Sequence, residues 1–188
     1  MDFSPARQQL YQALQRDPID LAQAALCIAQ REYPDLDPEP YLARLDTWAA
    51  ELADRLPDER YPLRVVREMS RYLAEDLGFL GNSERYYDPK NSYFNDVLDR
   101  RTGIPITLSL VYLEIAKRID FPMVGVGMPG HFLIRPDFED AGIFVDAFGN
   151  GEVLFPEDCQ ERLSEIYGRA IELRPEFLAP IDDRRLLV

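Results

Sequence analysis

Apolar residues recur every three or four positions through the first 80 residues, which is the spacing of amphipathic helices. A proline opens the last of these stretches, and Gly78 stands just past its end, as expected for a helix start and stop. Residues 1–80 are therefore predicted to form a helical N-terminal part. The predicted helices cover Leu10–Leu14, Ile19–Ile28, Tyr41–Leu56 and Pro62–Leu77.

The middle of the chain carries a more apolar segment. Residues 79–90 contain Gly-Asn and Asp-Pro pairs and predict a loop. A short helix is expected over Ser92–Arg100, and a second helix over Ile104–Arg118. Because the second helix is apolar on most sides, we expect it to lie at the centre of the fold.

After Pro122 the pattern changes from helix to strand. Short β-branched or aromatic runs are bounded by Gly, Pro and Asn, which predicts four strands. A helix is expected over Glu157–Tyr167, and the last residues resemble the start of another. Helices followed by closely connected strands indicate an α+β fold with an antiparallel sheet. The predicted strands are Met123–Gly127, His131–Arg135, Ile143–Asp146 and Glu152–Phe155.

Composition narrows the classes of partner. The chain has 188 residues, about one domain in length, and 46% of them are hydrophobic. It has 34 acidic and 21 basic residues and a net charge of −13. Such a field repels polyanions, so nucleic acids and anionic membranes are not expected as partners.

The few cysteines and the single histidine bear on the cellular compartment and on the kinds of metal site that the chain could form. No apolar run reaches the roughly 18 residues of a membrane span, and the N-terminus lacks a signal-peptide pattern. With only Cys27, expected to be buried, and Cys159, expected in a surface helix, a reducing cytoplasm is favoured. The only histidine is His131, so a multi-histidine metal site is excluded, and we expect no metal or other cofactor.

His131 and Asp146 are the predicted chemical pair. They belong to two consecutive predicted strands joined by a hairpin connection over 136–142. If the hairpin is symmetric about Phe138–Glu139, His131 stands directly opposite Asp146, and opposed residues share one face of a sheet. A carboxylate there would orient the imidazole and leave its other nitrogen free as a base. The alternative is a purely structural role, in which a buried histidine bonded to the carboxylate only stiffens the hairpin.

Such a pair needs a nucleophile. In cysteine acyl-transfer enzymes the thiol often opens a helix, where the helix dipole lowers its pKa. The helix expected to face the hairpin begins near Ile104, and its first turn contains no cysteine.

Three spaced motifs resemble the bacterial SirB-type family of the transglutaminase-like superfamily. They are Asn91–Leu98, Arg101–Ser109 and Gly125–Phe132, supported by shorter matches at 32–34, 81–82 and 86–89. The resemblance covers residues 20–155. It implies a papain-like core, a central helix on an antiparallel sheet, over residues 81–168. It also implies that residues 169–188 begin a tetratricopeptide-like helical extension, the whole chain forming one compact unit.

The resemblance also implies roles for individual residues. In active superfamily members a cysteine opens the central helix, a histidine begins one strand and an aspartate lies on the next. Those positions correspond to Pro105, His131 and Asp146 here. Proline carries no nucleophile, so the dyad would be a remnant. Locally, Pro105 suits a helix start, with Thr102 as a possible cap.

Other groups near the helix start are candidate site residues. Thr107 and Ser109 carry hydroxyls that need an aligned base to act as nucleophiles, and Tyr112 is interpreted as core or pocket wall. The amides of Asn91 and Asn95 either tie a loop or line the cleft. The expected binding residues are Asn91, Asn95, Pro105, Thr107, Ser109, Tyr112 and Gly130.

The favoured function is a degenerate transglutaminase-like domain that binds an unidentified protein or peptide and regulates it. The alternative is a hydrolase or acyl transferase that uses His131 and Asp146 with a Ser or Thr nucleophile or an activated water. A third reading is a structural relic whose helical half does the binding, around Trp48.

Overall fold

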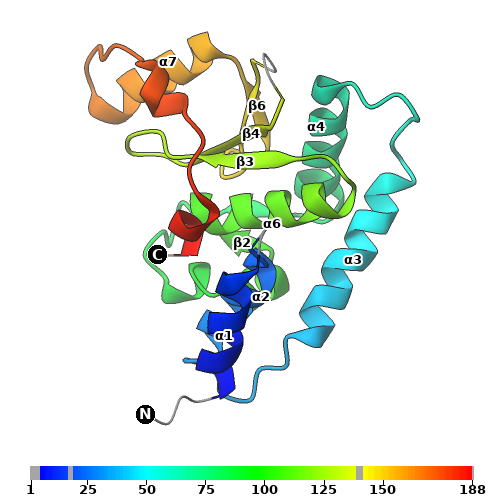
Figure 1. Ribbon diagram of the computed structural model, residues 1–188. Coiled ribbons are helices and arrows are strands. Elements are labelled where there is room, and N and C mark those ends of the chain that lie inside the picture. The colour runs from blue at the N-terminus through cyan, green and yellow to red at the C-terminus, as the bar shows by residue number, and fades with distance from the viewer. Residues whose placement is uncertain (1–4, 17–18, 139–141, 188) are drawn as a thin grey trace.

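The computed structural model describes residues 5–16, 19–138 and 142–187. The N-terminal half is helical, as predicted, and its helices lie beside and below the rest of the molecule in Figure 1. The fourth helix continues into one π-helical turn over Tyr72–Asp76. The helices are α1 (Pro5–Gln15), α2 (Leu21–Ala29), α3 (Glu39–Ala53) and α4 (Pro62–Arg71).

The centre of the fold is α6 (Pro105–Arg118), as predicted. Eleven of its 14 residues are buried, because α2, α3 and the sheet all pack around it. A shorter helix, α5 (Phe94–Arg100), precedes it. Between the two, β2 (Thr102–Gly103) pairs in parallel with β1 (Leu80–Gly81), which anchors the start of α6 to the loop after α4.

A four-stranded antiparallel sheet covers one side of α6, with the strands in chain order (Figure 1). Its two faces separate cleanly because side chains alternate along a strand. Ile134 and Val145 join the large core around α6, whereas Leu133 and Phe144 join a smaller core with α7. The α+β prediction is confirmed. The remaining elements are β3 (Met123–Val126), β4 (Leu133–Pro136), β5 (Phe144–Asp146), β6 (Glu152–Leu154) and α7 (Pro156–Tyr167).

Three details differ from the predictions. His131 lies in a bend two residues before β4 rather than in the strand itself. The pairing of Ile134 with Val145 shifts the hairpin register by two residues from the predicted one, which moves Asp146 opposite Leu133. The predicted hairpin centre at Phe138–Glu139 lies partly outside the described residues. The chain ends in a short 3₁₀ helix over Asp183–Leu187 rather than an α-helix.

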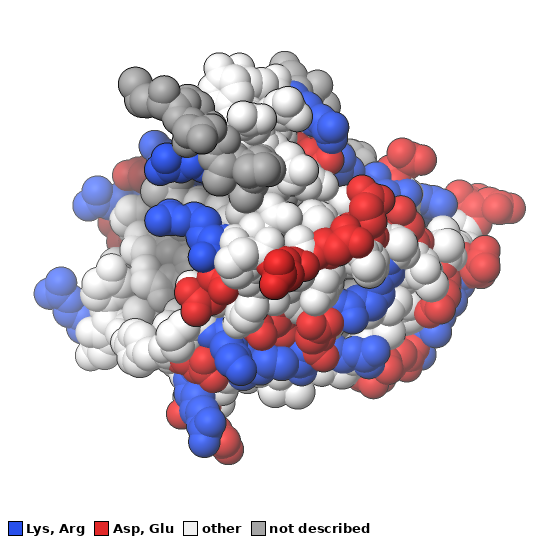
Figure 2. All heavy atoms as spheres, turned by 90° about the horizontal axis from the view of Figure 1, so that it is seen from below, with Lys and Arg blue, Asp and Glu red and all other residues white. Residues whose placement is uncertain are grey.

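Charged side chains of both signs share the molecular surface. Acidic and basic residues are interspersed on the face seen in Figure 2, and no single basic patch dominates that face. Within the described ranges, no helix has both the length and the apolar character needed to cross a bilayer.

Candidate functional site

Asp146 is the fixed centre of the site. It ends β5, and its side chain is only 1% exposed. Oδ1 accepts hydrogen bonds from the backbone N–H groups of Phe148 and Gly149, both at 3.0 Å. These bonds form a local turn that holds the carboxylate in place after the strand. Oδ2 is left to face two side chains from other segments.

His131 approaches Oδ2 of Asp146. Its Nε2 lies 2.9 Å from that oxygen, inside ion-pair distance, although the N–H direction misses hydrogen-bond geometry. Nε2 is buried, so the 12% of the side chain that stays exposed belongs to its other atoms. The pair therefore has the arrangement expected of an oriented imidazole, in which a carboxylate lies next to one of the two ring nitrogens.

A tight turn presents the histidine. The N–H of His131 donates to the carbonyl of Met128 at 2.9 Å, and Gly130 between them adopts a φ of +77°. A Cβ at Gly130 would lie 2.7 Å from Cγ2 of Ile166 on α7. Gly130 is thus required by the turn and by the close approach of α7. From the sequence we predicted Gly130 as a binding residue, whereas in the structure it positions His131.

The two-residue register shift explains why the pair still meets. Residues two apart on a strand point to the same face. His131 therefore keeps the side of the sheet on which Asp146 lies, and it reaches the carboxylate diagonally from the bend. This is the face covered by α7.

Arg162 on α7 completes the site, and the sequence pattern did not predict it. Its Nη1 donates to Oδ2 of Asp146 at 2.5 Å, and its Nη2 donates to Glu152 at 2.7 Å. No local pattern in the sequence marks Arg162, because the packing of α7 on the sheet is what brings it to Asp146. Charge alone does not single it out among 21 basic residues.

The surroundings keep Asp146 ionised. Burial raises the pKa of its carboxyl, but His131, the N–H of Gly149 and the Arg162 charge together outweigh burial and lower the pKa below its usual value. Asp146 therefore remains a carboxylate at neutral pH.

At the start of α6, Pro105 occupies the first helical position and is buried. Thr107, not Thr102, serves the helix end: its Oγ1 accepts the N–H of Ile104 at 3.1 Å and donates to the carbonyl of Asn91 at 2.7 Å. The Thr102 hydroxyl instead donates to the carbonyl of Arg100. The Thr107 hydroxyl is therefore occupied by backbone contacts.

Farther along α6 lie two other predicted residues. Ser109 is fully buried, and its Oγ has no hydrogen-bond partner among the described residues. Tyr112 is 2% exposed, and burial chiefly raises the pKa of its hydroxyl. That hydroxyl packs so closely against Gly151 that an added Cβ there would clash with it. Tyr112 thus wedges α6 against the turn after β5.

The two asparagines differ. Asn91 is fully buried: Nδ2 donates to the carbonyls of Arg85 and Tyr86, and Oδ1 accepts from Asn82. It ties the loop before α5 and has no atom free for a ligand. Asn95 is 5% exposed, and its buried Oδ1 has no hydrogen-bond partner within the described ranges.

Neither cysteine is exposed. Cys27 is buried, as predicted, and burial raises the pKa of its thiol. The sequence predicts Cys159 on a surface helix, but it is fully buried, because the face of α7 that carries it packs on the sheet. Burial is the main cause that raises the pKa of the Cys159 thiol to about 12. Both thiols are protonated at neutral pH.

The histidine, cysteine and acidic side chains of the described residues do not gather into a metal centre. Over the part of the chain that the structure describes, no three His, Cys, Asp or Glu side chains are grouped so that they could hold a metal ion.

Sequence comparison places this geometry in a family. The sequence pattern of the transglutaminase-like superfamily matches residues 39–188, which contain α6, the sheet and the His131–Asp146 pair. The chain belongs to the transglutaminase-like superfamily.

Its relatives include bacterial and animal proteins. A UPF0162 protein of Xylella fastidiosa is 36% identical over 174 residues, covering 90% of this chain and 62% of the relative. One of Pseudomonas aeruginosa is 33% identical over 172 residues, covering 92% and 62%. Human F-box only protein 21 is 41% identical over 106 residues, covering 52% of this chain and 17% of that protein. The transglutaminase-like chain thus spans less than two thirds of its bacterial relatives, and no solved structure matches it significantly.

Proposed function

We propose that this transglutaminase-like domain has lost the cysteine nucleophile and acts as a binding or regulatory module for a peptide or protein. The carrying observation is Pro105 at the first position of α6. The family resemblance assigns the cysteine of active superfamily members to this position. A proline there preserves the helix start and removes the nucleophile.

The remaining candidate nucleophiles support this proposal. The Thr107 hydroxyl is held by the backbone of Ile104 and Asn91. Ser109 is fully buried, and no hydrogen bond joins it to a base among the described residues. A hydroxyl nucleophile needs an aligned base within about 3 Å, so neither residue is arranged for attack. Cys27 and Cys159 are buried thiols with raised pKa values.

The geometry of His131 and Asp146 supports the proposal that the domain still binds a peptide or side-chain amide. His131 is held by a glycine turn, and Asp146 by two backbone N–H groups and Arg162. An imidazole fixed in this way, on a side chain that is 12% exposed, can hydrogen-bond a peptide or side-chain amide without turning it over. The human relative supports the idea of a module, because the shared stretch is 17% of that protein.

The rival reading, hydrolysis or acyl transfer by a hydroxyl or an activated water, predicts turnover. Incubation with a glutamine-containing peptide and a primary amine tests it through ammonia release. A fluorophosphonate probe tests for an activated hydroxyl. We expect neither ammonia release nor labelling. Catalysis lost on His131→Ala, or a labelled Thr107 or Ser109, would establish the rival.

Binding has its own readout because His131 is the only histidine. Its ring protons give one set of imidazole signals in a proton NMR spectrum. We expect titration with the same glutamine peptide to shift those signals saturably. Trp48 is buried in the main core, so Thr47→Arg on the exposed face of α3 tests the third hypothesis, in which the helical half binds. If the ring signals never move while Thr47→Arg weakens peptide binding, the proposed site is wrong.

A further inference from the structure

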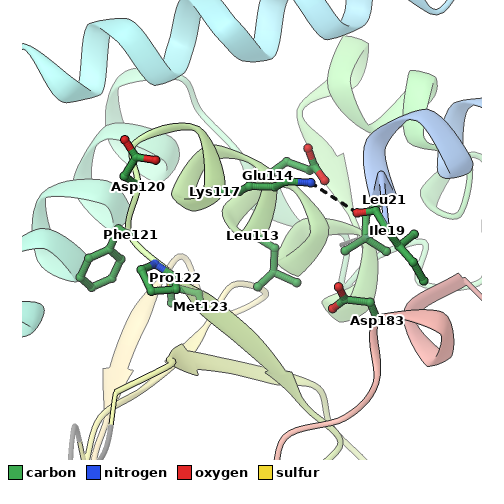
Figure 3. Close-up of a pocket in the computed structure, with 10 residues that line it drawn as sticks. All are labelled: Ile19, Leu21, Leu113, Glu114, Lys117, Asp120, Phe121, Pro122, Met123 and Asp183. Carbon is green, nitrogen blue, oxygen red and sulfur yellow. Dashed lines mark hydrogen bonds between the residues drawn. The ribbon is translucent and has the colours of Figure 1, made fainter. Parts of the chain in front are cut away.

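A separate cavity lies at the far end of α6 from Pro105. It has a volume of about 380 Å³, within the range of small-molecule sites. Figure 3 shows it bounded by the last turns of α6, the start of β3, the segment before α2 and the C-terminal 3₁₀ helix. None of the predicted site residues lines it. Its apolar lining comes from Ile19, Leu21, Leu113, Phe121, Pro122 and Met123.

Two opposite charges face this cavity from different walls. Lys117 extends from α6 with its ammonium on one side, and Asp183 points inward from the C-terminal 3₁₀ helix (Figure 3). Lys117 Nζ donates to the carbonyl of Ile19 at 3.3 Å, which uses one of its three N–H groups. Among the described ion pairs within 4.0 Å, Lys117 and Asp183 do not meet.

The other two acidic residues that line the cavity do not offer it a free carboxylate: Glu114 is hydrogen-bonded, and Asp120 points away. Glu114 is 2% exposed; one oxygen accepts the N–H of Ala22, and the other is paired with Arg118. Asp120 points away from the cavity in Figure 3. Asp183 is therefore the carboxylate that faces the space.

The environment of Asp183 agrees with a group that lacks a counter-ion in contact. Burial and the neighbouring Asp182 raise the pKa of its carboxyl, and the charge of Lys117 lowers it only in part. An ammonium group placed beside Asp183 would stabilise its ionised carboxylate, which burial and Asp182 disfavour.

We propose that this cavity binds a small zwitterion with an apolar side chain, of the kind of a free aliphatic α-amino acid. The ligand carboxylate would contact the ammonium of Lys117, the ligand ammonium would contact Asp183, and the side chain would pack on Leu113 and Met123. A zwitterion fits because it bridges two opposite charges that do not reach one another. The proposal is independent of the His131 site.

Calorimetric titration of the whole chain with L-leucine tests the proposal. Isoamylamine and 4-methylpentanoate serve as probes that lack the carboxylate and the amine. We expect saturable binding of L-leucine and at least tenfold weaker binding of each single-charge analogue. Equal affinity for all three, or no saturable L-leucine binding, would overturn the proposal.

Variants locate the site. Asp183→Asn should weaken L-leucine binding at least tenfold. Glu176→Gln is the control and should leave binding unchanged, because the Glu176 side chain is 63% exposed and does not line the cavity. Met123→Trp should abolish binding by filling the cavity, and it decides the matter if Asp183→Asn fails to fold. Undiminished L-leucine binding in folded Met123→Trp would overturn the proposal.

Discussion

Arg162 Nη1 and His131 Nε2 converge on the same atom, Oδ2 of Asp146, at 2.5 and 2.9 Å. The buried carboxylate is thus held from α7 and from the turn before β4 at once. This arrangement links the sheet to α7, and it makes Arg162 a positioning residue for the imidazole through Asp146.

Replacing Arg162 should therefore disturb both stability and the histidine. Arg162→Met should lower the free energy of unfolding by about 1–3 kcal/mol, because it leaves a buried carboxylate with one fewer partner. It should also shift the NMR signals of the His131 ring. Arg174→Met is the control, since the Arg174–Glu176 pair is about two-thirds exposed and contributes little. Equal effects of both variants would remove the positioning role.

Asp146 predicts a specific acid sensitivity. Its pKa is lowered in the folded state, so its ionisation stabilises the fold above the unfolded pKa of about 3.9 and loses that effect as pH falls through the folded value. Asp146→Asn should cost about 3 kcal/mol at pH 7, and the difference from the wild type should shrink toward pH 3.

Urea denaturation at pH 7, 5 and 3 measures this difference. The exposed Asp58 provides the control, and Asp58→Asn should leave the unfolding free energy unchanged at each pH. A gap between wild type and Asp146→Asn that stays constant across this range would show that ionisation of Asp146 does not stabilise the fold.

Gly130 should tolerate no side chain. Gly130→Ala adds both a strained positive φ and a clash with Ile166, and we expect a loss of about 2 kcal/mol or more. Gly78 has a similar φ of +76° but open space around it, so Gly78→Ala should cost only about 1 kcal/mol. Adding Ile166→Ala should recover part of the Gly130→Ala loss in a double-mutant cycle; strict additivity would contradict the packing argument.

The sequence predicted the order of elements because helical and alternating patterns are local. It also placed His131 and Asp146 on one face, since an error of two residues in register preserves the face and an error of one would not. The register itself depends on the connection between β4 and β5. We assumed a symmetric hairpin centred on Phe138–Glu139, and the observed pairing of Ile134 with Val145 differs from that register by two residues. Arg162 and the burial of Cys159 escaped prediction because both depend on how α7 packs on the sheet, a long-range contact with no local pattern.

Thr107 should act as a structural cap. Thr107→Val removes the hydrogen bonds of its hydroxyl to the backbones of Ile104 and Asn91 and should lower the free energy of unfolding by about 1–2 kcal/mol. Thr47→Val is the matched control, because the exposed Thr47 hydroxyl only bonds back to the carbonyl of Ala43 in its own helix. Thermal or urea denaturation measures both; a silent Thr107→Val would contradict the capping role.

The most direct test of the lost nucleophile is to restore it. The proposal requires a thiol at the start of α6 in Pro105→Cys to lie close enough to the dyad for its pKa to be lowered. We expect this new thiol to react with iodoacetamide at pH 6 at least tenfold faster than in the double variant that also carries His131→Ala. Peptide-level mass spectrometry separates it from Cys27 and Cys159. A thiol at position 105 that reacts equally with and without His131 would contradict the proposed correspondence between Pro105 and the lost cysteine.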